Sequence, residues 1–232
     1  MVYDPGPAVL LGSRYNKHHG KDGKFASADS VAAGGDGAAE EALTGSAAYR
    51  SVRTGYTRAG GLRPRPKGLT REELQDGEMS LRQYQTFSGT SQDHLRGRPS
   101  TGGSFQAASI KRVMDASPLQ QQIVVFRGIR DGKSTFKGMG GRYRDDMTGA
   151  TLTERGFLST TSKPKVAQSF ATEHRGGGGV VLEIRLPKGT GAVRLGGSGE
   201  NEILAQSGLR LKIVEDRGDV GGFRHLVAEA QL

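Results

Sequence analysis

The stretch VVLEIRLP, residues 180–187, alternates apolar and charged side chains with a period of two. This period places Leu182, Ile184 and Leu186 on one face, as in a β-strand with one buried side. The stretch LRLKIVED, residues 209–216, alternates in the same way. Both segments therefore predict strands that turn an apolar face toward a common core.

Further candidate elements surround these two strands. Short apolar runs predict strands over residues 123–129, 155–161 and 224–232. Helical patterns come earlier in the chain, over residues 69–75, 80–87 and 104–117, and the first of them opens with the capping-box pair Thr70 and Glu73. Helices followed by short strands predict an α+β domain with mainly antiparallel sheets.

Residues 1–68 differ in composition from the rest of the chain. They include YNKHHGKDGKFAS and VAAGGDGAAEEALTG, which are small, polar and rich in glycine, with no sustained apolar period. Such composition is typical of disorder. The prolines of GGLRPRPKG, residues 60–68, indicate a linker. We therefore expect a disordered, basic segment over residues 1–68 and one folded catalytic domain over residues 69–232.

The composition also excludes several classes of function. The 232 residues include no cysteine, which removes disulfides, thiolate catalysis and zinc–thiolate sites. The five histidines lack HxxxH or HExxH spacing, and no apolar run reaches the ~18–20 residues of a membrane helix. We therefore expect neither a metal site nor membrane contact. The net charge of +9 favours anionic partners, nucleic acid among them, although it also serves simple solubility.

Two candidate site motifs lie on the first predicted strands. Arg127 stands in the apolar run VVFRG, where a guanidinium needs an anion or a dense set of acceptors unless it reaches solvent from an edge strand. Ser159, Thr160 and Thr161 end the run GFLSTT. Their hydroxyls are placed to orient a neighbouring carboxylate, although Ser and Thr also commonly end strands and cap the following helix.

A third motif is the pair Glu200 and Glu202 in GSGENEIL, residues 197–204. Period-two geometry places both side chains on one face, about 7 Å apart along the strand. Their mutual repulsion raises the cost of ionising both unless a cation or a developing positive charge lies between them. An oxocarbenium ion, formed when a glycosidic bond breaks, is such a charge. The alternative is a solvated strand end.

The order of these motifs, Arg127, then Ser159-Thr160-Thr161, then Glu200 and Glu202, resembles the Arg–Ser–Glu class of mono-ADP-ribosyltransferases. The segments GFLSTT, VVLEIRLPKGTGAVRL, GENEIL and LRLKI are similar to the core of the clostridial binary-toxin and Rho-modifying exoenzymes. LRQYQTFSGTSQDHLRG is similar to the helical tyrosine-to-arginine stretch of that family. The resemblance covers roughly residues 69–232. It implies two roughly perpendicular antiparallel sheets that enclose a cleft for NAD.

The resemblance also implies a role for each motif residue. Arg127 would bind the phosphate and ribose region of NAD, and Gly128 would let the backbone approach the nicotinamide amide. Ser159, followed by Thr160 and Thr161, would orient Glu202. Glu202 would hydrogen-bond the nicotinamide ribose and stabilise the oxocarbenium, while Glu200 would receive the nucleophile. Phe170 is a candidate aromatic wall beside nicotinamide, with a core position as its alternative.

A carboxylate at Glu200 implies arginine as the acceptor, because relatives with glutamine there modify asparagine or other acceptors. Two departures from the family pattern stand out. Thr161 replaces a serine, and the loop LGGSG, residues 195–199, lacks the aromatic residue with which many relatives grip their target. Plain NAD hydrolysis therefore stays open as an alternative activity. A catalytically silent virion or nucleic-acid-binding protein on the same fold is the second alternative.

The N-terminal segment HHGKDGKFAS resembles short basic segments of phage head-associated proteins, some of which carry ADP-ribosyltransferase domains. This resemblance implies action in the cytoplasm of a bacterial host or target cell. Delivery would be with a phage particle or by a toxin-secretion route.

Overall fold

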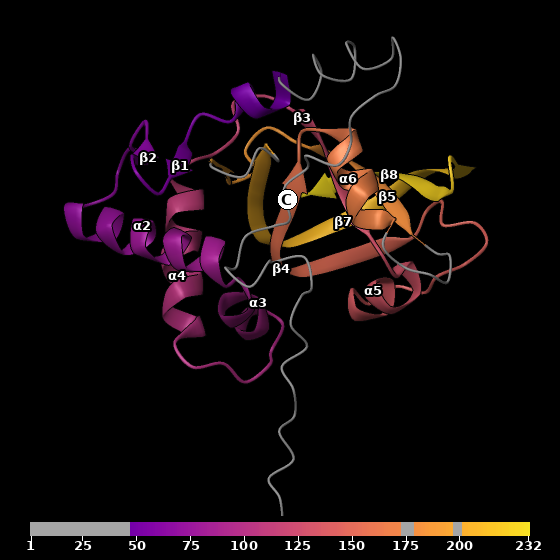
Figure 1. Cartoon of the computed structure of the whole chain (residues 1–232), viewed down its shortest axis with the longest axis horizontal. Coiled ribbons are helices and arrows are strands. Elements are labelled where there is room, and N and C mark those ends of the chain that lie inside the picture. The colour runs from indigo at the N-terminus through magenta and orange to yellow at the C-terminus, as the bar shows by residue number, and fades with distance from the viewer. Residues whose placement is uncertain (1–46, 173–178, 197–200) are drawn as a thin grey trace, which may run out of the picture.

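The computed structural model describes residues 47–172, 179–196 and 201–232. After a helical turn at residues 47–51, the helices are α2 (Arg71–Thr86), α3 (Gly89–Leu95), α4 (Gly103–Asp115), α5 (Gly132–Gly138) and α6 (Pro164–Ala171). The strands are β1 (Gly55–Thr57), β2 (Gly61–Arg63), β3 (Ile123–Ile129), β4 (Thr151–Thr161), β5 (Val180–Leu186), β6 (Ala192–Leu195), β7 (Glu202–Val220) and β8 (Phe223–Gln231). Figure 1 shows α2, α3 and α4 gathered on one side of the molecule, with the long strands on the other.

The predicted α+β class is confirmed. The strands follow the order β2-β1-β6-β7-β4-β3-β5-β8, and β8 also pairs with β7. All eight strands therefore belong to one hydrogen-bonded sheet. The long strand β7 pairs with β6 near its start and with β8 along its second half. Register shifts in that second half let the strand bend between its two partners. Most pairings are antiparallel, but β1–β6 and β5–β8 are parallel.

Strands β3 and β4 meet at a single register pair, Phe126 with Thr161. The same row continues across the sheet from Thr161 to Glu202, and from Glu202 to Leu195. Leu195 pairs in turn with Tyr56 of β1. One row of the sheet therefore joins the strand of Arg127, the serine-motif strand and the glutamate strand.

Two apolar cores hold this arrangement. The first lies among the strands and includes Leu182, Ile184 and Leu186, the three side chains that the alternation of residues 180–187 predicts to be buried. The second lies between the sheet and helices α2 and α4, and Phe157 of β4 contributes to it. The capping box of α2 is present, because the Thr70 side chain accepts from the Glu73 backbone N–H and the Glu73 side chain accepts from the Thr70 N–H.

The expected start of the folded domain at residue 69 is too late. Residues 47–51 are helical, and strands β1 and β2 occupy part of the segment that we expected to be disordered or linker. Tyr56 and Leu62 are almost fully buried in the second core. Strands of three residues are too short to show a period of two, and β1 is held by pairing with the distant β6. Residues 1–46 lie outside the described residues.

Candidate active site

Glu202 is the first residue of β7, and Ser159 lies on the neighbouring strand β4. The register places Ser159 opposite Leu204, so Ser159 is the diagonal neighbour of Glu202 on the same face of the sheet. The Ser159 Oγ donates a hydrogen bond to the Glu202 Oε1 at 2.7 Å. The contact expected between the serine motif and a carboxylate is therefore present in the fold.

Glu202 is only 6% exposed. Burial raises the pKa of Glu202 to about 7, although the hydrogen bond from Ser159 opposes the shift. Burial disfavours the charged form because water no longer solvates it. Near neutral pH the carboxyl is therefore divided between protonated and ionised forms, a state typical of groups that do chemistry.

Arg127 meets the anion that its position in an apolar strand requires. Its Nη1 donates to the Glu154 Oε2 at 3.0 Å. The other oxygen of Glu154 accepts from the Arg96 Nη2 at 3.1 Å and from the Gly156 N–H at 2.9 Å. Arg96 is the C-cap residue of α3. A single carboxylate therefore joins β3, β4 and the end of a helix.

The Glu154 carboxylate stays charged in this position. Burial by itself raises its pKa, but Arg127, Arg96 and the Gly156 N–H together hold the pKa of Glu154 below its ordinary value. Two guanidiniums against one carboxylate leave a net charge of about +1 at this point. The excess suits an anionic group of a ligand.

Tyr84 of α2 is buried against Gln92 and Phe157. Its hydroxyl accepts from the Gln92 Nε2 at 2.9 Å, and its ring meets Phe157 edge-on at 6.0 Å. Burial raises the pKa of Tyr84 well above its ordinary value. The charge of Glu202 raises that pKa further, whereas Arg127 and Arg96 lower it. The charges of both acidic sites therefore act on this one buried hydroxyl.

The other hydroxyls of the serine motif tie the strands together. The Thr160 Oγ1 donates to the carbonyl of Ile203 at 2.7 Å. The Thr161 Oγ1 accepts from the backbone N–H of Lys163 at 3.1 Å, at the start of α6. These contacts fix β4 against β7 and the following helix, and they give both residues a structural reason to be present.

Gly128 packs against α6. A Cβ at this position would lie 1.9 Å from the carbonyl oxygen of Ala167 and 2.7 Å from the Cβ of Phe170. The structure thus requires glycine for the approach of a helix, in addition to the approach of a ligand that the sequence resemblance implies. Phe170 is half-buried at this contact.

Glu200 lies outside the described residues, so the prediction that it shares a face with Glu202 stays a prediction. The residue between them, Asn201, has a φ of 48°, a left-handed conformation that asparagine adopts more readily than most residues. Its carbonyl accepts from the Ser162 N–H at 3.2 Å. The turn into β7 is therefore fixed against the end of the serine motif.

Neither a metal site nor a membrane helix emerges from the parts of the chain that the structure describes. Among them, no group of three or more histidine, aspartate or glutamate side chains is placed to hold a metal ion. No helix in these parts is long and apolar enough to cross a membrane.

Sequence reasoning did not single out Glu154, Arg96 or Tyr84. Tyr84 and Arg96 stand in the stretch LRQYQTFSGTSQDHLRG, where only the overall similarity was noted. Glu154 could have been noticed as an acidic residue shortly before the apolar run GFL. The buried face of its strand otherwise carries few charges. The position of Arg127 in an apolar strand was the hint that a buried acid was needed.

Comparison with known proteins gives the family. A family model described as ADP-ribosyltransferase exoenzyme matches residues 77–231. The chain belongs to the ADP-ribosyltransferase exoenzyme family. This ADP-ribosyltransferase therefore takes NAD as its substrate and carries out mono-ADP-ribosylation. No curated protein matches the chain.

Solved structures of ADP-ribosyltransferases share its fold at low sequence identity. C3stau2 from S. aureus, solved with NAD, has a TM-score of 0.57 at 16% identity, over 83% of this chain and 95% of that chain. Vis toxin from Vibrio splendidus has a TM-score of 0.53 at 17% identity, over 88% of this chain and 90% of that chain. The C2-I component from Clostridium botulinum has a TM-score of 0.54 at 18% identity, over 70% of this chain and 44% of that chain.

The residues of this ADP-ribosyltransferase fit a dinucleotide substrate. The Arg127–Glu154–Arg96 cluster carries an excess positive charge, which suits a diphosphate. The buried carboxyl of Glu202, held by Ser159, suits a sugar carbon that develops positive charge.

Proposed function

We propose that this ADP-ribosyltransferase transfers one ADP-ribose unit from NAD to an arginine side chain of a target protein and releases nicotinamide. The observation that carries the proposal is the 2.7 Å hydrogen bond from Ser159 to the buried carboxyl of Glu202. It supports the proposal because it holds a carboxylate in one rotamer before the substrate arrives, and preorganised charge is what stabilises a cationic transition state.

NAD supplies a ribose carbon that becomes transiently cationic as nicotinamide leaves. Glu202, in its ionised form, stabilises that charge and accepts a hydrogen bond from the ribose 2′-hydroxyl. Ser159 keeps the carboxylate oriented, and Arg127 binds the diphosphate through the guanidinium N–H groups that do not face Glu154. Gly128, Thr160, Thr161 and Phe170 complete the proposed NAD site.

Arginine as acceptor is proposed from the identity of Glu200. A carboxylate pairs bidentately with a guanidinium and assists its deprotonation, which makes the nitrogen a nucleophile. The Vis toxin has been solved in complex with agmatine, a small molecule that ends in a guanidinium group. A relative with the same fold therefore binds a compound with this chemical group, which supports the proposal here.

The proposed catalytic domain begins at about residue 47, since β1 and β2 belong to the sheet. Toxins of several bacteria share the fold. We propose that residues 1–46 serve delivery, by a phage particle or a toxin-secretion route, into a cell whose cytoplasm holds the target.

The test is incubation with labelled NAD and an arginine-rich protein acceptor, with nicotinamide release measured in parallel. We expect label on the acceptor, and none on the same acceptor with its arginines replaced by lysine. Glu202→Gln should lower the labelling rate by about 10³-fold, the usual cost of removing a transition-state contact. Glu215→Gln, which changes a partly exposed glutamate further along β7, is the matched control and should leave the rate unchanged.

Three outcomes decide the proposal. A Glu202→Gln rate within threefold of the unsubstituted chain contradicts the mechanism. Label on the lysine-substituted acceptor contradicts arginine specificity. Nicotinamide release without any label favours NAD glycohydrolase instead, a second candidate suggested by the short loop LGGSG without an aromatic residue.

A further inference from the structure

The contacts of Glu154 converge from three parts of the chain. Arg127 is 27 residues away and Arg96 is 58 residues away, yet both guanidiniums reach the same carboxylate. The Glu154 side chain is 3% exposed, while Arg127 is 19% and Arg96 33% exposed. The Glu154 carboxylate is therefore buried, and the two arginine side chains are closer to the surface than it is.

The arginines keep donors for a ligand. A guanidinium has five N–H donors, and each of these two arginines donates to Glu154 through a single nitrogen. The remaining N–H groups of both guanidiniums are not used by Glu154, and both side chains are more exposed than Glu154. A buried carboxylate behind two arginines thus orients them outward without neutralising both.

The geometry points to Glu154 as a positioning residue that holds Arg127 and Arg96 as a paired diphosphate site for NAD. This inference rests on the proposed function, in which Arg127 binds the diphosphate. Glu154 does not touch the substrate itself. It acts by fixing two long side chains in advance, which lowers the entropy lost when the substrate binds.

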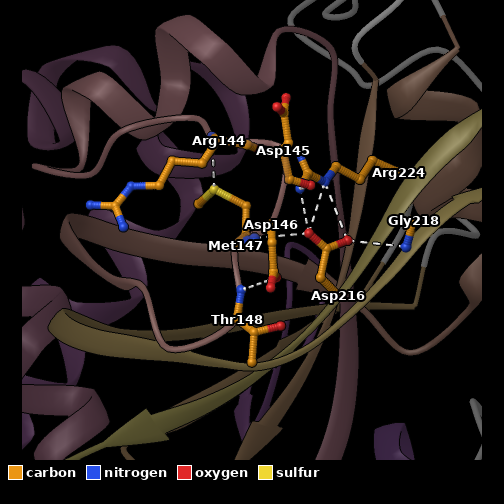
Figure 2. A network of polar contacts seen from close by, with 8 residues as sticks. All are labelled: Arg144, Asp145, Asp146, Met147, Thr148, Asp216, Gly218 and Arg224. Atoms are coloured by element: carbon orange, nitrogen blue, oxygen red, sulfur yellow. Dashed lines mark hydrogen bonds and ion pairs between the residues drawn. The ribbon is translucent and has the colours of Figure 1, made fainter.

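A purely structural role is the competing explanation, because the same contacts also fasten α3 to the sheet. A second buried ion pair of this chain provides the control. Asp216 of β7 and Arg224 of β8 are 5% and 12% exposed, and Figure 2 shows how they connect the two strands to residues 144–148. Asp216 lies far along β7 from Glu202, so its loss should weaken the fold without touching the proposed site.

The experiment measures NAD affinity by calorimetry and thermal unfolding for the full chain and for the variants Glu154→Gln, Glu154→Asp and Asp216→Asn. We expect both Glu154 variants to raise the dissociation constant for NAD about tenfold or more. KM for NAD should rise likewise, while kcat at saturating NAD falls less than threefold. Asp216→Asn should lower the melting temperature and leave the dissociation constant within twofold of the unsubstituted chain.

Glu154→Asp keeps the charge and shortens the side chain by one methylene. It therefore tests whether the carboxylate must extend to both arginines, even if Glu154→Gln fails to fold. A double-mutant cycle with Arg127→Gln adds a second readout, and the effects on NAD affinity should be less than additive. A dissociation constant within twofold for the folded Glu154 variants, or full additivity, overturns this inference alone. No NAD binding by the unsubstituted chain overturns the proposed function as well.

Discussion

The two arginine–carboxylate clusters of this protein differ in charge balance and in exposure. At Glu154, two arginines share one carboxylate, and both lie partly exposed at the proposed NAD site. At Asp216, a single arginine, Arg224, meets one carboxylate and two backbone carbonyls, those of Arg144 and Asp145.

The second cluster makes further contacts within the protein. Arg224 also lies over the ring of Tyr143, at 4.9 Å from its centroid. Asp216 accepts from the backbone N–H groups of Met147 and Gly218. Although burial alone raises it, Arg224 and these two N–H groups hold the pKa of Asp216 below its ordinary value.

The difference lies in charge balance. The Asp216–Arg224 cluster is neutral, and its donors are taken up by the protein itself. The Glu154 cluster keeps about one excess positive charge and unused donors, an arrangement that costs stability unless an anion binds. In the proposed function, the balanced ion pair serves the fold and the unbalanced one serves a ligand.

The largest expected effect breaks the closed cluster. Arg224→Gln leaves Asp216 buried without its cation and leaves two carbonyls without a donor, so we expect the free energy of unfolding to fall by about 4 kcal/mol. Chemical denaturation measures this loss. Activity per folded molecule should be unchanged. A loss below 1 kcal/mol would show that the cluster contributes little to the fold.

The pH dependence of stability should separate Glu202 of the proposed site from the Asp216 cluster. The folded pKa of Glu202, about 7, exceeds its unfolded value of about 4.3. Its contribution to the free energy of unfolding is therefore fully present below pH ~4.3 and is lost as pH rises through 7, by about 4 kcal/mol at most. Asp216 has the opposite sign, since its folded pKa is lowered. Its contribution is present above pH ~4 and is lost as the solution becomes more acidic.

Denaturation curves between pH 3 and 9 measure both contributions. Glu202→Gln should flatten the decline between pH ~4.3 and ~7, and Asp216→Asn should flatten the acid limb only. If Glu202→Gln leaves the neutral limb unchanged, the pKa of Glu202 is not raised in the folded protein.

The next effect concerns activity rather than stability. Arg127→Lys keeps a positive charge beside Glu154 but loses the planar fork that grips a diphosphate. We expect kcat/KM for NAD to fall about 100-fold, equivalent to about 2.7 kcal/mol, with a melting temperature close to that of the unsubstituted chain. Steady-state kinetics with varied NAD checks the loss. An equal loss in the control Arg185→Gln, an exposed pair with Glu229, would point to a general effect of arginine removal.

The smallest effect is expected where an arginine–carboxylate contact is exposed. Arg217 meets Glu183 at 3.0 Å and Glu215 at 3.1 Å, but its side chain is 39% exposed. Water and salt screen such contacts, so Arg217→Gln should lower the free energy of unfolding by less than 1 kcal/mol despite two partners. Denaturation of this variant in parallel with Arg224→Gln sharpens the comparison. A loss above 2 kcal/mol would show that burial is not what separates the clusters.

Much of the fold could be predicted because its signals are local. The alternation in residues 180–187 identifies β5 and its buried face, and the capping box at Thr70 identifies the start of α2. The segment 55–63 could not be predicted in this way. Strands β1 and β2 carry three residues each, and they form because β6, more than 100 residues later, supplies a partner.

The candidate site divides in the same manner. Arg127, Ser159 and Glu202 could be singled out because each residue type is unusual at its place in a strand. Glu154 could not, because register shifts on β4 between Glu154 and Leu158 change which face a side chain takes. After such a shift, counting every second residue along the strand no longer identifies the side chains on one face.

The sequence by itself determined the α+β class, the order of the strand motifs and the residues that carry unusual charge or hydroxyl groups. Only the tertiary structure decided that Glu154 holds Arg127 and Arg96. The physical reason is the separation along the chain between the residues that interact. Secondary structure follows from side chains a few residues apart, whereas a buried carboxylate finds its cations through strand register and helix packing between residues far apart in the chain.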